Sequence, residues 1–82
     1  MNEVDVMLFV NFIISIEQAC LSTYTGIIVE VTHTDDETIM RLFNADYMQL
    51  ASVILEKYFA EYMDGKPLKC IISDIFCQIE NV

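Results

Sequence analysis

The sequence has very few of the residues that break or loosen a chain. Its 82 residues include two Gly, one Pro and no Trp, which leaves little room for long loops or flexible linkers. A chain of this length supports one hydrophobic core rather than two. Its apolar fraction of 55% exceeds the roughly 45–50% of soluble domains. We therefore expect residues 1–82 to form one small domain with apolar surface that a second subunit, as in a homodimer, or a partner protein covers.

Basic residues are scarce as well. Four Lys and Arg stand against 13 Asp and Glu, which gives a net charge of −9, and residues 1–40 contain no Lys or Arg at all. Nucleic-acid phosphates and anionic membrane surfaces are bound mainly through cationic side chains, so direct binding to either is argued against. The charge favours a partner protein with a basic surface, such as a nucleic-acid-handling enzyme. In the alternative interpretation the acidity serves solubility alone.

The residues from which active sites are built are few and scattered. His33 is the single histidine, and the two glycines lie 39 positions apart, so no phosphate-binding glycine loop exists. Cys20, Cys70 and Cys77 form no Cys-x-x-Cys pair, and Cys70 and Cys77 lie ~10.5 Å apart along a helix, too far for a disulfide. We interpret the cysteines as small buried hydrophobes. The sequence predicts a protein that is not an enzyme and has no cofactor and no metal site.

The apolar run from Val6 to Ile16 invites comparison with a targeting or membrane segment. It follows Glu3 and Asp5 rather than a basic stretch, and no small-residue cleavage site comes after it. The run is also shorter than the about 20 residues that span a bilayer. Together with an odd number of cysteines, this predicts a soluble protein of a reducing cytoplasm, the host cytosol if a phage encodes it.

The same segment is ambiguous in secondary structure. Every even position from Val4 to Ile16 is apolar, which is typical of a strand, but such a strand would far exceed the usual ~5–6 residues. Asn2 is a good helix N-cap, and four polar residues share one helical stripe: Asn11, Ser15, Gln18 and Ser22. We expect a helix from about Glu3 to Leu21 that is buried on most of its circumference, with a strand as the alternative.

The next segment has the composition of a β-hairpin. Residues 27–32 are rich in β-branched side chains, the acids of Thr34–Glu37 suit a four-residue turn, and residues 38–43 can return as a second strand. Thr34 and Glu37 also form a capping box, so a helix starting there, in a nearly all-α protein, is the alternative. We favour the hairpin, because a lone strand would leave its backbone groups unpaired.

Two helices are expected to complete the chain. The first begins at Asn44 or Asp46 and runs to about Asp64, where Gly65 and Pro67 end it. Helical spacing is clearest in the last segment, at Leu68, Ile71, Ile72, Ile75, Phe76 and Ile79. The predicted fold is therefore α+β, in the order helix, β-hairpin, helix, helix.

Six residues are candidates for contact with a partner. Glu30 and the cluster Asp35, Asp36 and Glu37 can pair with Arg or Lys on another protein, and Tyr47 and Phe59 belong to an aromatic-rich segment of the kind that is enriched at interfaces. We expect Tyr58 and Tyr62 to fill the core instead.

Two functions fit these observations. The first is an inhibitor or regulator that occupies the basic, nucleic-acid-binding surface of a partner protein. Phage-encoded antagonists of restriction and CRISPR systems, and toxin immunity proteins, commonly have this size and charge; the analogy is one of class, since no motif here matches a known family. The second is a homo-oligomeric assembly module that joins two copies through apolar surface.

Overall fold

The computed structural model describes residues 2–80 and, for Glu80, the backbone alone. It confirms the predicted α+β class and the order helix, hairpin, helix, helix, with one strand added to the hairpin. The elements are α1 (Glu3–Thr23), β1 (Ile28–His33), β2 (Thr38–Phe43), β3 (Gln49–Ile54), α2 (Leu55–Met63) and α3 (Leu68–Glu80).

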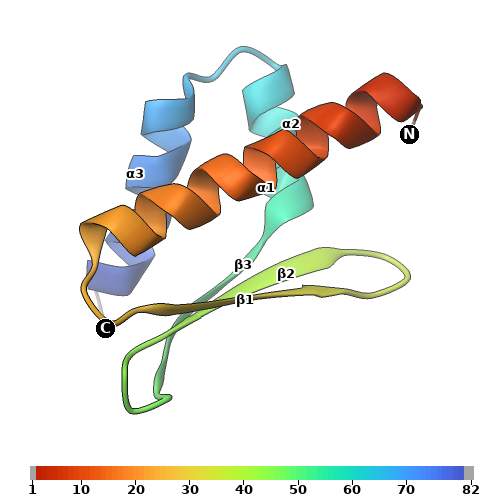
Figure 1. Ribbon diagram of the computed structural model, residues 1–82. Coiled ribbons are helices and arrows are strands. Elements are labelled where there is room, and N and C mark those ends of the chain that lie inside the picture. The colour runs from red at the N-terminus through yellow and green to blue at the C-terminus, as the bar shows by residue number, and fades with distance from the viewer. Residues whose placement is uncertain (1, 81–82) are drawn as a thin grey trace.

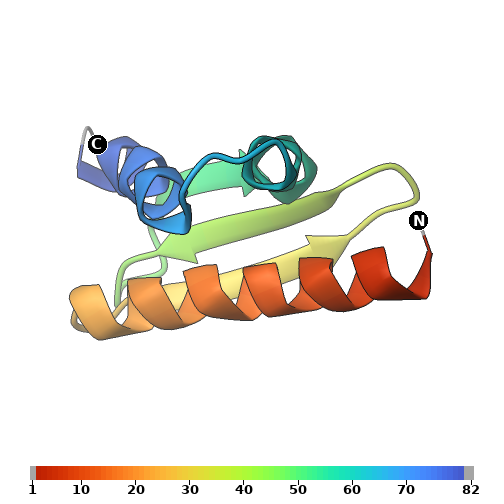
Figure 2. The ribbon, with the colours of Figure 1, turned by 90° about the horizontal axis from the view of Figure 1, so that it is seen from above.

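The three strands form one antiparallel sheet in the order β1-β2-β3. All three helices lie on the same side of this sheet (Figure 1). Seen from above, α1 runs along one side of the molecule, and α2 and α3 occupy the other (Figure 2). The core fills the space between the helices and the inner face of the sheet, where Met40, Leu42, Ala51 and Val53 are buried.

The N-terminal segment is a helix, as expected from its polar stripe and its cap. The side-chain oxygen of Asn2 accepts the backbone N–H of Asp5 at 2.9 Å, which satisfies one of the free donors of the first turn. The expectation that α1 is buried on most of its circumference was wrong. Four α1 side chains are buried, namely Phe9, Phe12, Ile16 and Cys20, and they form one narrow stripe that faces the core.

The length argument against a membrane segment does not apply to the whole of α1. The most apolar 18-residue window of this 21-residue helix has a mean hydropathy of 1.7, so α1 meets, by length and composition, the criteria for crossing a membrane. Of that window, 22% is buried. A typical core helix of a soluble protein would be mostly buried. The helix therefore exposes an unusual amount of apolar surface.

The predicted helix from Asn44 or Asp46 to Asp64 was wrong in its first half. Gln49–Ile54 is a strand, and the helix begins only at Leu55. Asn44 caps a turn rather than a helix: its Oδ1 accepts the backbone N–H groups of Asp46 and Met48, both at 2.9 Å. The chain thus reverses at residues 44–48 and adds β3 to the free edge of β2.

The end of α2 and the start of α3 follow the sequence prediction closely. Gly65 has φ +106°, a left-handed conformation that favours glycine after a helix. Pro67 lies one position before Leu68, the first residue of α3, and its carbonyl accepts the N–H of Ile71. Between them, the Lys66 ammonium contacts Glu61 of α2 at 2.8 Å and Asp74 of α3 at 2.6 Å. This ion pair network links the two helices across their short connection.

Candidate functional site

The β1–β2 connection is an acidic tip, which we define as Asp35, Asp36 and Glu37. The turn is closed by Thr34, whose backbone N–H donates to the Glu37 carbonyl at 2.8 Å and whose hydroxyl oxygen accepts the Glu37 N–H at 3.1 Å. Because the backbone groups at both ends of the turn are satisfied, the Asp35 and Asp36 side chains are left exposed and Glu37 is half-buried. The predicted hairpin is therefore confirmed, and the capping-box residues of the alternative helix close a turn instead.

None of the described residues forms an ion pair with the acidic tip. Among the described residues, Arg41 pairs with Glu30, which lies directly opposite it in the β1–β2 register, at 3.2 Å. The hydrogen bonds of Lys66 to Asp74 and Glu61 raise the pKa of its ammonium group. The ion pair with Arg41 neutralises Glu30 on the outer face of the sheet, away from the tip.

The two aromatic candidates differ in exposure: Tyr47 is exposed and Phe59 is buried. Tyr47 is 69% exposed in the turn between β2 and β3, with φ +65°, and its ring lies 5.7 Å from that of Phe43. Phe59 is 7% exposed and packs in the core, with its ring 4.8 Å from that of Phe9. Phe59 is therefore a core residue that offers little surface to a partner.

The six candidates do not form one surface. The acidic tip lies at one end of the sheet, Tyr47 lies in the turn at the other end, and Glu30 lies between them on the strand. The α1 N-terminus, with Glu3 and Asp5, is at the same end of the molecule as the tip in both views (Figures 1 and 2). Negative charge is therefore concentrated at this end.

A polar network that the sequence did not reveal links the β1–β2 hairpin to α2. Glu56, in the first turn of α2, accepts the backbone N–H of Thr38 at 2.7 Å, and His33 Nδ1 lies 3.2 Å from the Thr38 hydroxyl. Partial burial acts to raise the pKa of Glu56, but the hydrogen bonds from Thr38 and the charge of His33 outweigh it and lower the pKa. Thr38 is 4% exposed, so its hydroxyl is closed to a substrate.

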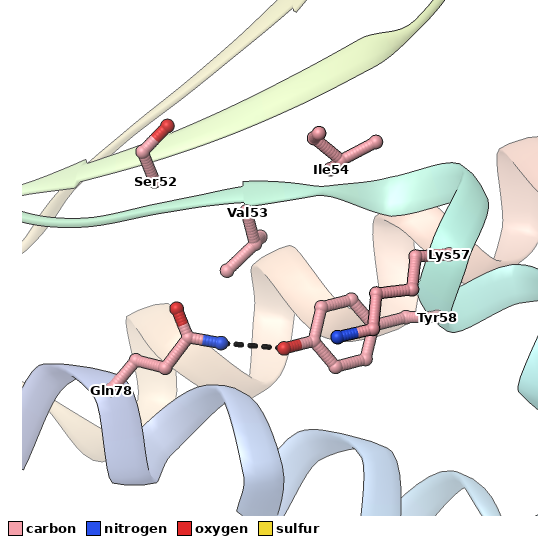
Figure 3. Close-up of a pocket in the computed structure, with 6 residues that line it drawn as sticks. All are labelled: Ser52, Val53, Ile54, Lys57, Tyr58 and Gln78. Carbon is pink, nitrogen blue, oxygen red and sulfur yellow. Dashed lines mark hydrogen bonds between the residues drawn. The ribbon is translucent and has the colours of Figure 1, made fainter.

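A hollow lies where β3, α2 and α3 meet (Figure 3). Its volume is about 230 Å³, and it is lined by Ser52, Val53, Ile54, Lys57, Tyr58 and Gln78. The Gln78 amide donates to the Tyr58 hydroxyl across its floor, and the Lys57 ammonium lies 5.5 Å from the centre of the Tyr58 ring. The volume is below the ~300–1,000 Å³ of ordinary ligand pockets. The Ser52 side chain points to the side of β3 away from Lys57 (Figure 3), so no base adjoins its hydroxyl and it is not an activated nucleophile.

A second depression, of about 470 Å³, lies on the surface at the end of α2 and is lined by Ala60, Glu61, Met63 and Asp64. All four lining residues come from one helix end, and none of them is a histidine or a cysteine. This depression does not gather the chemical groups that a catalytic site requires.

The cysteines differ from one another. Burial, aided by the charge of Glu17, raises the pKa of the Cys20 thiol to about 11, so this thiol is protonated at neutral pH. Cys70 is half-buried and Cys77 is exposed, so the interpretation of all three as buried hydrophobes holds for Cys20 alone. Within residues 2–80, no three His, Cys, Asp or Glu side chains are grouped so as to hold a metal ion.

Comparison with known protein families, with characterised proteins and with solved structures finds no match to this chain. The candidate surfaces therefore rest on the geometry described above.

Proposed function

We propose that this protein is a non-enzymatic inhibitor or regulator that binds a basic, nucleic-acid-binding surface of a partner protein through the acidic tip. The observation that carries the proposal is the state of the charges. Arg41 and Lys66 are held in internal ion pairs, whereas Asp35 and Asp36 are exposed on a closed turn and form no ion pair within the described chain. Such carboxylates are free to pair with Arg or Lys of a partner.

The turn geometry adds to this support. A projecting turn can enter a groove that a flat surface cannot, and the hydrogen bonds of Thr34 fix its backbone before binding. The high negative charge of the whole chain would also speed the encounter with a basic partner.

The test is affinity capture from a lysate of the source cells at ~0.05 M and ~0.5 M salt, a range over which exposed ion pairs become strongly screened. We expect a partner that is retained at low salt, released at high salt and displaced by heparin, a polyanion that competes for basic surfaces. Asp35→Asn/Asp36→Asn should lose most of this capture.

The matched control is Asp46→Asn/Asp64→Asn, which removes the same charge at two exposed positions away from the tip. Equal loss of capture in both variants would show that net charge, rather than the tip, is responsible. Capture that is indifferent to salt and to the tip variant would contradict the proposal.

The second candidate function, a homo-oligomeric assembly module, is favoured by one specific observation, the exposed apolar face of α1. It does not exclude the first, because α1 presents this face from a different part of the molecule.

A further inference from the structure

The helix α1 exposes more apolar surface than its place in a small domain requires. Seven large apolar side chains of this one helix are exposed: Val4, Val6, Met7, Leu8, Val10, Ile14 and Leu21. Their exposed parts together amount to roughly 600 Å², of which the four that share one side of the helix, Met7, Val10, Ile14 and Leu21, contribute roughly 370 Å², within the range of the largest apolar patch on a typical monomer. Patches of this size on a soluble domain generally mark a surface that another molecule covers.

The spacing of these side chains indicates what kind of molecule could pack against them. Met7, Val10, Ile14 and Leu21 follow one another at intervals of three, four and seven residues, which is the 3.5-residue period of a helix-pairing seam. The seam is ~21 Å long at 1.5 Å per residue. Glu3 and Glu17 occupy its remaining positions, and the uncharged Asn11 and Gln18 flank it on one side. A second helix fits this narrow seam.

A lipid surface fits it poorly. Helices that lie on membranes combine a broad apolar face with Lys and Arg on the polar side, whereas α1 carries Glu3, Asp5 and Glu17 and no cation. Crossing a bilayer would also remove Phe9, Phe12 and two further side chains from the core. Both arguments favour a protein helix.

The charges on the seam point to α1 of a second copy, in antiparallel orientation. When residue i faces residue 24 − i of the second copy, Val10 meets Ile14 at the centre. Glu17 then meets Met7, and Glu3 meets Leu21, so no acid faces an acid. In a parallel pair, Glu17 would face Glu17 and Glu3 would face Glu3, which is repulsive.

We propose that the protein forms a twofold-symmetric dimer in which the α1 helices of two copies pack antiparallel along the seam of Met7, Val10, Ile14 and Leu21. The four seam side chains of two copies together bury ~740 Å² of apolar surface, which is the size of a weak, concentration-dependent interface. In Figure 2 the outer side of α1 is clear of the other elements, so a second copy can approach it. The proposal does not depend on the acidic tip or its partner.

The test is sedimentation equilibrium of the full chain between ~1 and ~100 μM, at ~0.05 and ~0.5 M salt. We expect a dimer that is at least as tight at high salt, because salt screens the repulsion between two chains of charge −9. Val10→Asp/Ile14→Asp should weaken the dimer at least 10-fold. Gln49→Glu/Ser73→Asp is the control: it adds the same charge at exposed positions outside α1 and should leave the dimer intact. Circular dichroism establishes that both variants fold.

Orientation is tested by disulfide formation in a Cys77→Ser background. An equimolar mixture of Val10→Cys and Ile14→Cys chains should cross-link faster than either chain alone if the helices are antiparallel; faster cross-linking of each chain with itself would overturn that orientation. A chain that is monomeric at 100 μM, or a dimer that Val10→Asp/Ile14→Asp leaves unchanged, would overturn the proposal. So would a monomer that floats with vesicles of neutral phospholipid, which would assign the seam to a bilayer.

Discussion

Single side-chain oxygens determine where this chain turns. The Thr34 hydroxyl closes the β1–β2 turn and the Asn44 amide closes the β2–β3 turn, each by accepting backbone N–H groups. Thr and Asn side-chain oxygens also accept backbone N–H groups at helix N-termini, so the sequence was compatible with a helix starting at either position. Residue type alone cannot separate the two outcomes, because the choice depends on whether the following segment pairs with a neighbouring strand.

The charge of Glu56 should contribute to the stability of the fold. Since its pKa is lowered in the folded state, its contribution is fully present above the unfolded value of about 4.5 and is lost as the pH falls through the folded value. Glu56→Gln keeps an oxygen that can accept the Thr38 N–H but removes the charge. We expect the difference in free energy of unfolding between the wild type and Glu56→Gln to be constant near neutral pH and to shrink below pH 4.5.

Urea unfolding of both proteins between pH 3 and pH 7 measures this difference. Comparing the two proteins cancels the titration of the other acids, which is common to both. A difference that does not change over this range would contradict the assigned role of Glu56.

At the scale of elements, periodicity identified α3 and failed at β3. The helix α1 was predicted instead from its polar stripe, its N-cap and its length, and the first two strands were predicted from composition. Leu50, Ala51, Ile54 and Tyr58 recur at helical spacing, which hid the alternation of Ala51 and Val53 inward with Ser52 and Ile54 outward. Six residues are too few for one period to exclude the other. Residues 49–54 form a strand because they pair with the free edge of β2, and that edge exists only in the folded sheet.

The exposed seam of α1 was missed for a related reason. Sequence shows how apolar a helix is, but the number of neighbouring elements decides how much of it is covered. A sheet of three strands and two short helices is too small to enclose 21 residues on most sides. The candidate acids of the tip, in contrast, could be located from sequence, because charged residues between two strand-like segments are exposed in almost any arrangement.

The packing of α1 onto α2 depends on Phe59. Its ring lies 4.8 Å from that of Phe9 and 5.4 Å from that of Phe12. We expect Phe59→Ala to lower the free energy of unfolding by about 3–5 kcal/mol, a large share of the about 5–15 kcal/mol typical of a domain. Met63→Ala, on the same helix at a side chain that is 50% exposed, is the control and should change it by no more than about 0.5 kcal/mol.

Denaturant unfolding monitored by circular dichroism gives both values. A cost below about 1 kcal/mol for Phe59→Ala would be too small for a buried aromatic side chain. That result would return Phe59 to the candidates for partner contact.

At the scale of the whole molecule, two different surfaces coexist. The acidic tip and the N-terminus of α1 concentrate negative charge at one end, while the seam of α1 offers apolar area along one side (Figures 1 and 2). An antiparallel α1 dimer would place the two acidic tips at opposite ends of the assembly. Such a dimer would suit a partner that presents two basic surfaces, and linked binding of both would raise the overall affinity.

The most direct test of the proposed function is a competition measurement on the captured partner. The affinity of that partner for duplex DNA is measured with and without this protein at ~0.1 M salt. The wild type should weaken DNA binding as its concentration rises, Asp46→Asn/Asp64→Asn should do the same, and Asp35→Asn/Asp36→Asn should have little effect. DNA binding that is unchanged at saturating wild-type protein would contradict occupation of a nucleic-acid-binding surface by the acidic tip.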